Sequence, residues 1–138
     1  MLPINYIAVL VAAIANFVIG FLAHGPVFGK VWMKLANIHP TGNEKFSDMI
    51  PQMVQNFLAN IVFAYVLAVV IFVTSSYYNN VGNVIGAMGI SFWMWLGFIV
   101  TSSSMEVIWM GRTLKYWLFE MATSLVCILV MGAIIAVW

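Results

Sequence analysis

The stretch from Ile4 to Ala23 reads INYIAVLVAAIANFVIGFLA and carries no charged side chain. A membrane-spanning helix needs about 20 predominantly apolar residues, which this stretch supplies. No basic segment precedes it, it is longer than the roughly 7–15 apolar residues of a signal peptide, and it runs into His24-Gly25-Pro26 rather than a cleavage site of small residues. We therefore expect a retained transmembrane helix.

The composition of the whole chain also indicates lipid as its solvent. Of the 138 residues, 64% are apolar and 7% are charged, whereas soluble domains average about 45–50% and about 25%. This balance excludes a water-soluble globule and a disordered chain. The net charge of +1 leaves no basic surface for nucleic acid. Cys127, the single cysteine, excludes an intrachain disulfide.

Three further apolar stretches are long enough to cross a bilayer. The first span covers residues 4–23, and the three further stretches cover residues 51–76, 82–104 and 114–138. The predicted fold is therefore all-α, an integral membrane four-helix bundle in a single domain. For the second span, Ser47 and Asp48 are candidate N-caps, and Pro51 suits the first helical turn because its missing N–H is not needed there.

The connection between the first two spans contains a helical pattern of its own. Residues 27–38 read VFGKVWMKLANI, with apolar and polar side chains on opposite faces. The apolar face holds Phe28, Val31, Trp32 and Leu35, and the polar face holds Lys30, Lys34 and Asn37. This pattern predicts a short amphipathic helix in the headgroup layer, with a partner-binding helix as the alternative.

The basic residues predict how the chain is threaded through the cell membrane. The second connection, residues 77–81, has none, and all five lie in or beside the first and third connections: Lys30, Lys34, Lys45, Arg112 and Lys115. The positive-inside rule then places these two connections in the cytoplasm and both termini outside.

Several segments resemble those of a known family. After the first span, Pro26 is followed by Phe28-Gly29-Lys30-Val31-Trp32-Met33, a Phe-Gly-Lys-x-Trp-Met motif. Residues 95–98, 111–115 and the C-terminal Val130-Met131-Gly132-Ala133-Ile134-Ile135-Ala136-Val137-Trp138 match as well. Together they resemble a bacterial domain-of-unknown-function family of small four-span integral membrane proteins. At Ala23-His24 the chain departs from the aromatic pair expected there. The resemblance implies the topology and supplies no activity.

Small and polar residues recur along the first three spans. The rows are Ala8, Ala12, Asn16, Gly20 and His24; Gln52, Asn56 and Asn60; and Gly82, Gly86, Gly89 and Gly97. Small residues let helices approach closely in lipid, and amides bond across to neighbours. We therefore expect packing seams that include Gly20, Gly86, Gly89 and Gly97, with Asn60 facing protein. The alternative is a polar path that ends at His24, as a proton or solute gate.

Glu106 and Glu120 are the acids nearest the spans. One hypothesis gathers them with His24 as a proton or cation site. The other, which we favour because basic residues are plentiful nearby, pairs Glu106 with Arg112 and Glu120 with Lys115, Lys30 or Lys34. Residues 101–104, Thr-Ser-Ser-Ser, need no ligand to explain them because hydroxyls can donate to the carbonyls of their own helix.

The sequence shows no phosphate-binding loop, no nucleophile set and no paired histidines. We therefore predict no enzyme, no catalytic residues, no cofactor and no metal site. We expect a self-associating or accessory subunit of a membrane complex, with the lipid bilayer and a homo-oligomer or larger complex as partners. The alternative is a small transporter or channel for protons or a small solute. Four helices scarcely enclose a path alone, and the internal repeats typical of transporters are not evident, which favours the first reading.

Overall fold

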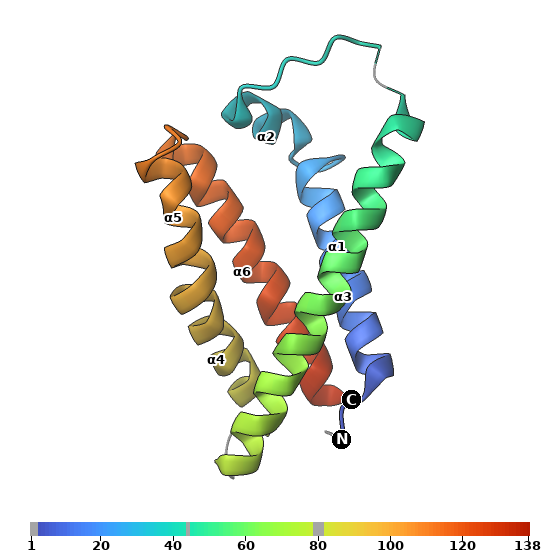
Figure 1. Cartoon of the computed structure of the whole chain (residues 1–138), viewed down its shortest axis with the longest axis vertical. Helices are drawn as coiled ribbons and strands as arrows, with labels where there is room; N and C mark the ends of the chain where they lie inside the picture. Colours follow the sequence, from blue (N-terminus) through green and yellow to red (C-terminus); the bar gives the residue numbers. More distant parts are fainter. Residues whose placement is uncertain (1–2, 44, 79–81) are drawn as a thin grey trace.

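The computed structural model describes residues 3–43, 45–78 and 82–138, and all the regular structure in these ranges is helical (Figure 1). The elements in order are α1 (Tyr6–His24), α2 (Gly29–Ala36), α3 (Phe46–Tyr77), α4 (Val84–Met94), η1 (Trp95–Val100), α5 (Thr101–Ile108) and α6 (Leu114–Val137). Because α4, η1 and α5 are continuous, four helices are long and apolar enough to cross a membrane: α1, α3, Val84–Ile108 and α6. The predicted all-α bundle is confirmed.

The start of α3 differs from the prediction. The helix begins at Phe46 rather than at Pro51, its N-cap is Lys45, and neither Ser47 nor Asp48 caps it. Asp48 instead lies in the first turn, where a carboxylate is favourable beside the positive end of the helix dipole. The 32 residues of α3 extend about 48 Å at 1.5 Å per residue, so the helix exceeds the roughly 30 Å hydrocarbon core and projects beyond it.

The surface helix α2 lies within the predicted range 27–38 and ends at Asn37. This residue adopts the left-handed conformation, with φ of 57°, which is typical of a helix C-terminus and tolerated by asparagine. The N–H of Ile38 then donates to the Met33 carbonyl at 2.8 Å. The local chemistry therefore stops the helix after two turns.

The connections segregate to two ends of the molecule (Figure 1). The helix α2 and the turn between α5 and α6 lie at one end, with all five Lys and Arg residues in or beside them and at the start of α3; we call it the basic end. Both chain termini lie at the other, which we call the terminal end. There the Asn5 side-chain N–H donates to the Trp138 carbonyl at 3.3 Å.

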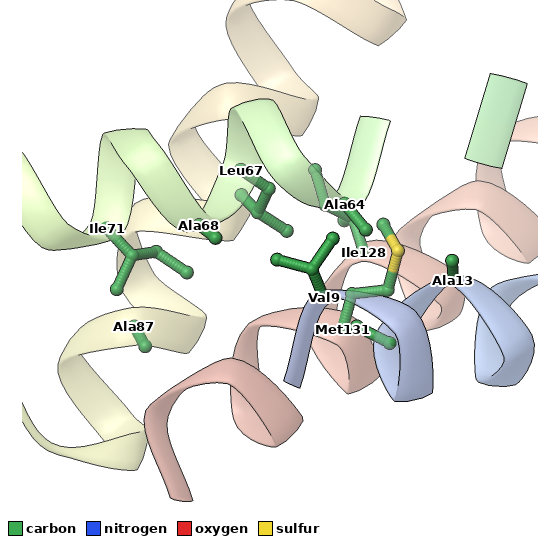
Figure 2. Close-up of a cluster of buried hydrophobic side chains, with 10 residues drawn as sticks. Val9, Ala13, Ala64, Leu67, Ala68, Ile71, Ala87, Ile128 and Met131 are labelled. Atoms are coloured by element: carbon green, nitrogen blue, oxygen red, sulfur yellow. The ribbon is translucent and has the colours of Figure 1, made fainter. Parts of the chain in front are cut away.

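The buried apolar core lies in the terminal half of the bundle, and Figure 2 shows its side chains. It joins the first turns of α1 to the later turns of α3 and α6 and to the start of α4. Its members are Val9, Ala12, Ala13, Ala64, Leu67, Ala68, Ile71, Ala87, Ile128 and Met131. Close packing is therefore concentrated toward the terminal end. Nearer the basic end, the helices present polar side chains to one another.

At Gly132, α6 approaches α4 closely. A Cβ built there would collide with Ser91 Oγ and lie 3.2 Å from the Ala87 carbonyl oxygen. The predicted packing glycines behave differently, because a Cβ at Gly20, Gly89 or Gly97 meets nothing within 4 Å. Within the described ranges these three glycines are not close-contact positions. Gly86 serves another purpose, since its N–H donates to the Asn83 side chain at the start of α4 at 2.8 Å.

The third span is interrupted by the π-helical segment η1, Trp95–Val100. Such segments widen a helix locally and re-aim the side chains that follow. Trp95 at its start donates its indole N–H to Ser124 Oγ on α6 at 2.9 Å. The hydroxyls just beyond η1 donate to carbonyls of their own helix, as predicted: Thr101 to Gly97, Ser102 to Phe98, Ser103 to Val100 and Ser104 to Thr101.

Candidate functional site

A pocket of about 390 Å³ lies between α1, α3 and α6, on the side of the core that faces the basic end. Its polar wall is built from all three helices. Asn16 and His24 come from α1, Asn56 and Asn60 from α3, and Glu120, Thr123, Ser124 and Cys127 from α6. The remainder of the wall is apolar and aromatic, formed by Phe17, Phe21, Phe63 and Met53, with Gly20 between them.

Helical periodicity explains why these residues meet. Asn16, Gly20 and His24 are four apart and therefore share one face of α1. Asn56 and Asn60 do the same on α3, and α6 repeats the pattern from Glu120 onward. Five of the six predicted polar residues therefore line one pocket: Asn16, His24, Asn56, Asn60 and Glu120. Glu106 is not among them.

A hydrogen bond between amides crosses the inner part of the pocket. Asn16 donates its side-chain N–H to the Asn60 side-chain oxygen at 3.0 Å, which joins α1 to α3. Asn60 thus faces protein, as predicted. In lipid an unpaired amide is costly, and the pair satisfies one group on each helix.

The outer part of the pocket is closed by His24 and Glu120. The imidazole Nε2 lies 3.1 Å and 3.2 Å from the two carboxylate oxygens, and Nδ1 lies 2.8 Å from the Gly20 carbonyl oxygen. Trp32 of α2 donates its indole N–H to Glu120 Oε1 at 2.9 Å. The carboxylate therefore joins α6 to both α1 and α2.

These contacts determine how many protons the pair holds. A carbonyl oxygen only accepts, so Nδ1 must carry a proton to bond Gly20. If the Glu120 carboxylate is ionised, it only accepts, so Nε2 must carry a second proton and the ring is an imidazolium. If the ring is neutral, Nε2 accepts and the protonated carboxyl group donates to it. In either arrangement one proton lies between Nε2 and the carboxyl group, and the pair is neutral overall.

Aromatic rings fix the imidazole in place. The Trp32 and Phe119 rings meet it edge-on, with centroid separations of 5.2 Å and 5.9 Å. The two side chains of the pair are 31% and 26% exposed, so the proton they share lies next to the pocket rather than in the packed core. A half-buried acid and base at the mouth of a polar pocket can bind a solute and exchange a proton with it.

The favoured ion-pair hypothesis is wrong for both acids. Among the described residues the ion pair is His24 with Glu120, at 3.1 Å, in place of Lys115, Lys30 or Lys34. Glu106 has no such partner, and its main-chain carbonyl accepts from the Arg112 N–H at 3.1 Å. The Arg112 guanidinium instead lies over the Tyr116 ring, 5.2 Å from its centroid, an attraction that competes with an exposed ion pair.

Two residues at the site could not be assigned from sequence. Trp32 was expected only on the apolar face of α2, and its bond to Glu120 depends on how the Gly25-Pro26 turn folds α2 back over the bundle. Ser124 lines the pocket beside Glu120, and no spacing rule indicates that it accepts the indole N–H of Trp95 from the third span.

A model of a protein family described as "protein of unknown function (DUF1761)" matches residues 7–136. The chain belongs to this family. The predicted resemblance to a domain-of-unknown-function family is thereby confirmed, while its individual motifs stay predictions. No curated protein and no solved structure matches the chain. The family description assigns no activity, and the four long apolar helices indicate a membrane protein. The chemistry of the site must therefore come from its geometry.

Metal binding receives no support from the side chains that the structure describes. No three His, Cys, Asp or Glu residues gather there as ligands. The pocket of this DUF1761 member offers instead amide, hydroxyl and carboxyl groups beside phenylalanine rings. Such a wall suits a small solute that donates hydrogen bonds or carries a positive charge.

Proposed function

We propose that the protein is a small transporter-like membrane protein that exchanges a proton for a small organic cation in the pocket between α1, α3 and α6. The observation that carries the proposal is the His24–Glu120 pair at the mouth of a 390 Å³ pocket. Small-ligand sites typically occupy about 300–1,000 Å³. Ionisable groups inside a membrane are costly and mark ion or proton sites by default.

Charge balance links the two ligands. The pair is neutral while it holds its shared proton, and loss of that proton leaves a single negative charge. A monovalent cation in the pocket restores neutrality, so proton and cation compete for the same carboxylate. Phe17, Phe21 and Phe63 line the pocket, and phenyl rings attract an alkylammonium group through cation–π interactions.

The role of the remaining parts follows from their positions. The apolar core lies between the pocket and the terminal end, which supports access from the basic end. The Asn16–Asn60 bond closes the inner wall. Trp32 orients the Glu120 carboxylate and is a positioning residue, since it touches the acid through its indole N–H.

Binding of tetramethylammonium and choline to the purified protein in detergent tests this function. We expect wild-type protein to release a proton on binding, measured by calorimetry in buffers of different ionisation enthalpy. Glu120→Gln should abolish binding, and Glu106→Gln, which lies outside the pocket, should leave it intact. Binding by Glu120→Gln at wild-type affinity, or binding without proton release, would contradict the proposal.

Self-association is a second, compatible proposal, supported by the third span. Gly89 and Gly97 are exposed and have open space at the position of a Cβ, and Trp93 between them is 69% exposed. Small residues on an unpacked helix face allow a second membrane helix to approach closely. We expect a homo-oligomer in native membrane extracts that Gly89→Leu or Gly97→Leu dissociates, whereas His24→Ala leaves it whole. A wild-type monomer in such extracts would contradict this.

A further inference from the structure

Two hollows meet on the flank of the basic end, outside the polar pocket. The first, of about 640 Å³, lies between α1, α2 and α6 and is apolar, with Leu22, Val27, Val31, Phe119, Ala122 and Val126 in its wall. The second, of about 650 Å³, is lined by Lys30, Val31, Lys34, Leu35, Thr113 and Lys115. Val31 belongs to both, so the apolar groove continues into a basic rim.

The groove has fixed walls because α2 is attached to α6. The Phe28 and Phe119 rings meet at 6.3 Å between centroids, and the Trp32 indole bonds Glu120. These contacts hold the lysines of α2 facing the start of α6. The Thr113 hydroxyl caps α6 by accepting from the Tyr116 N–H at 3.3 Å, so the positive end of this 24-residue helix adds to the same rim.

The rim carries uncompensated positive charge. Lys30, Lys34 and Lys115 form no ion pair with any side chain that the structure describes, and no acid lines the hollow. Three ammonium groups and a helix N-terminus together match a phosphate, which offers several acceptor oxygens.

The dimensions match one leaflet of a bilayer. Val126 in the groove is 11 residues beyond Lys115 on the rim, or about 16 Å along α6 at 1.5 Å per residue. One leaflet contributes about half of a hydrocarbon core of roughly 30 Å. A groove of this length therefore accommodates an acyl chain whose headgroup lies at the lysines.

We propose that this composite surface binds one anionic phospholipid, with its phosphate at Lys30, Lys34 and Lys115 and an acyl chain in the groove between α1, α2 and α6. Basic pockets between membrane helices recognise anionic headgroups in this way. Thr123 lines both this groove and the polar pocket, so the two adjoin, but the lipid site does not depend on the function proposed for the pocket.

Native mass spectrometry of the full chain, equilibrated with equal amounts of phosphatidylglycerol and phosphatidylcholine bearing the same acyl chains, tests the site. We expect the wild type to retain phosphatidylglycerol in preference, by about tenfold or more, since each of the three lysines contributes attraction. The combined variant K30Q/K34Q/K115Q should lose this preference. The matched control K45Q/R112Q removes two charges from the same end but outside the site, and should retain it.

A groove variant tests the acyl chain independently. Ala122→Trp places an indole in the groove and should reduce retention of both lipids without changing their ratio. Equal retention of the two lipids by the wild type, or an unchanged preference in K30Q/K34Q/K115Q with normal helix content, would overturn the proposal. A dimer that forms only when lipid is removed and is lost in Ala122→Trp would assign the groove to a second copy and also overturn it.

Discussion

The imidazole Nε2 of His24 lies 3.1 Å from the carboxylate Oε1 of Glu120, although the two residues are 96 positions apart in the sequence. Each is anchored by a second bond, His24 to the Gly20 carbonyl and Glu120 from the Trp32 indole. The four residues form a chain of polar contacts that joins α1, α6 and α2 at the basic end. Substituting His24, Glu120 or Trp32 changes either the charge or the orientation of the pair.

Trp32→Phe removes the indole N–H while keeping an aromatic ring at the position. Glu120 then loses a donor in a low-dielectric setting, and we expect the free energy of unfolding in detergent to fall by about 1–2 kcal/mol. The matched control is Trp109→Phe, because Trp109 is 80% exposed and should change stability little. Equal effects of the two substitutions would show that the Trp32–Glu120 bond does not stabilise the bundle.

Proton competition predicts how cation binding varies with pH. Below the range in which imidazoles titrate, about pH 5–8, the pair keeps its proton and is neutral, so binding of tetramethylammonium should weaken as the pH falls. His24→Gln should flatten the dependence between pH 5 and 8. A wild-type affinity constant across this range would contradict the exchange.

Asn16 and Asn60 should be energetically coupled. Replacing either by Leu leaves the other amide without its partner, whereas replacing both removes the need for the bond. A double-mutant cycle on unfolding in detergent should give a coupling of about 0.6–1.7 kcal/mol, the range found for membrane hydrogen bonds. Additive effects would mean that the 3.0 Å contact contributes nothing to stability.

Gly132→Ala should destabilise the protein by about 1–3 kcal/mol, the usual cost of overpacking. The added methyl group collides with Ser91 Oγ, and Ser91 is fully buried. Ser91→Gly in the same chain should restore part of the loss, because it removes the colliding atoms. Gly89→Ala is the matched control, since its Cβ would meet nothing within 4 Å, and a loss as large as that of Gly132→Ala would refute the contact.

The threading of the chain can be tested with single cysteines in a Cys127→Ala background. We expect Lys34→Cys, on α2, to react with an impermeant maleimide only from the cytoplasmic side. Tyr78→Cys, at a position 65% exposed, should react from outside. The reverse pattern would show that the basic connections lie outside the cell and would invert the proposed orientation.

Much of the fold could be predicted because lipid imposes a simple rule. Every span must be apolar and about 20 residues long, so the four helices follow from hydropathy alone. The prediction failed at the start of α3, because the first turn lies outside the hydrocarbon core and hydropathy does not fix where it begins. The residue at which the helix starts, Phe46 rather than Pro51, depends there on local interactions. Residues 79–81 of the second connection lie outside the described residues.

The polar pocket was half predictable. Spacing by four placed Asn16, Gly20 and His24 on one face, but spacing does not say which neighbouring helix that face meets. For the same reason, spacing did not indicate that Gly20 lines the pocket or that Gly132 makes the close contact with α4, and packing at Gly86, Gly89 and Gly97 stays a prediction. The sequence offered several basic residues as partners of Glu120, and only the packing of α1 against α6 shows that His24 contacts it.

The placement of the core has a mechanical consequence. Val9, Ala12 and Ala13 hold α1 against its neighbours near one end, and His24 is 11 residues further along, about 16 Å at 1.5 Å per residue. A tilt of α1 about Ala12 and Ala13 therefore displaces a residue more the farther along the helix it lies. Among the α1 residues that line the pocket, His24 is the farthest from these alanines, so its contact with Glu120 is the pocket contact most sensitive to the tilt of α1.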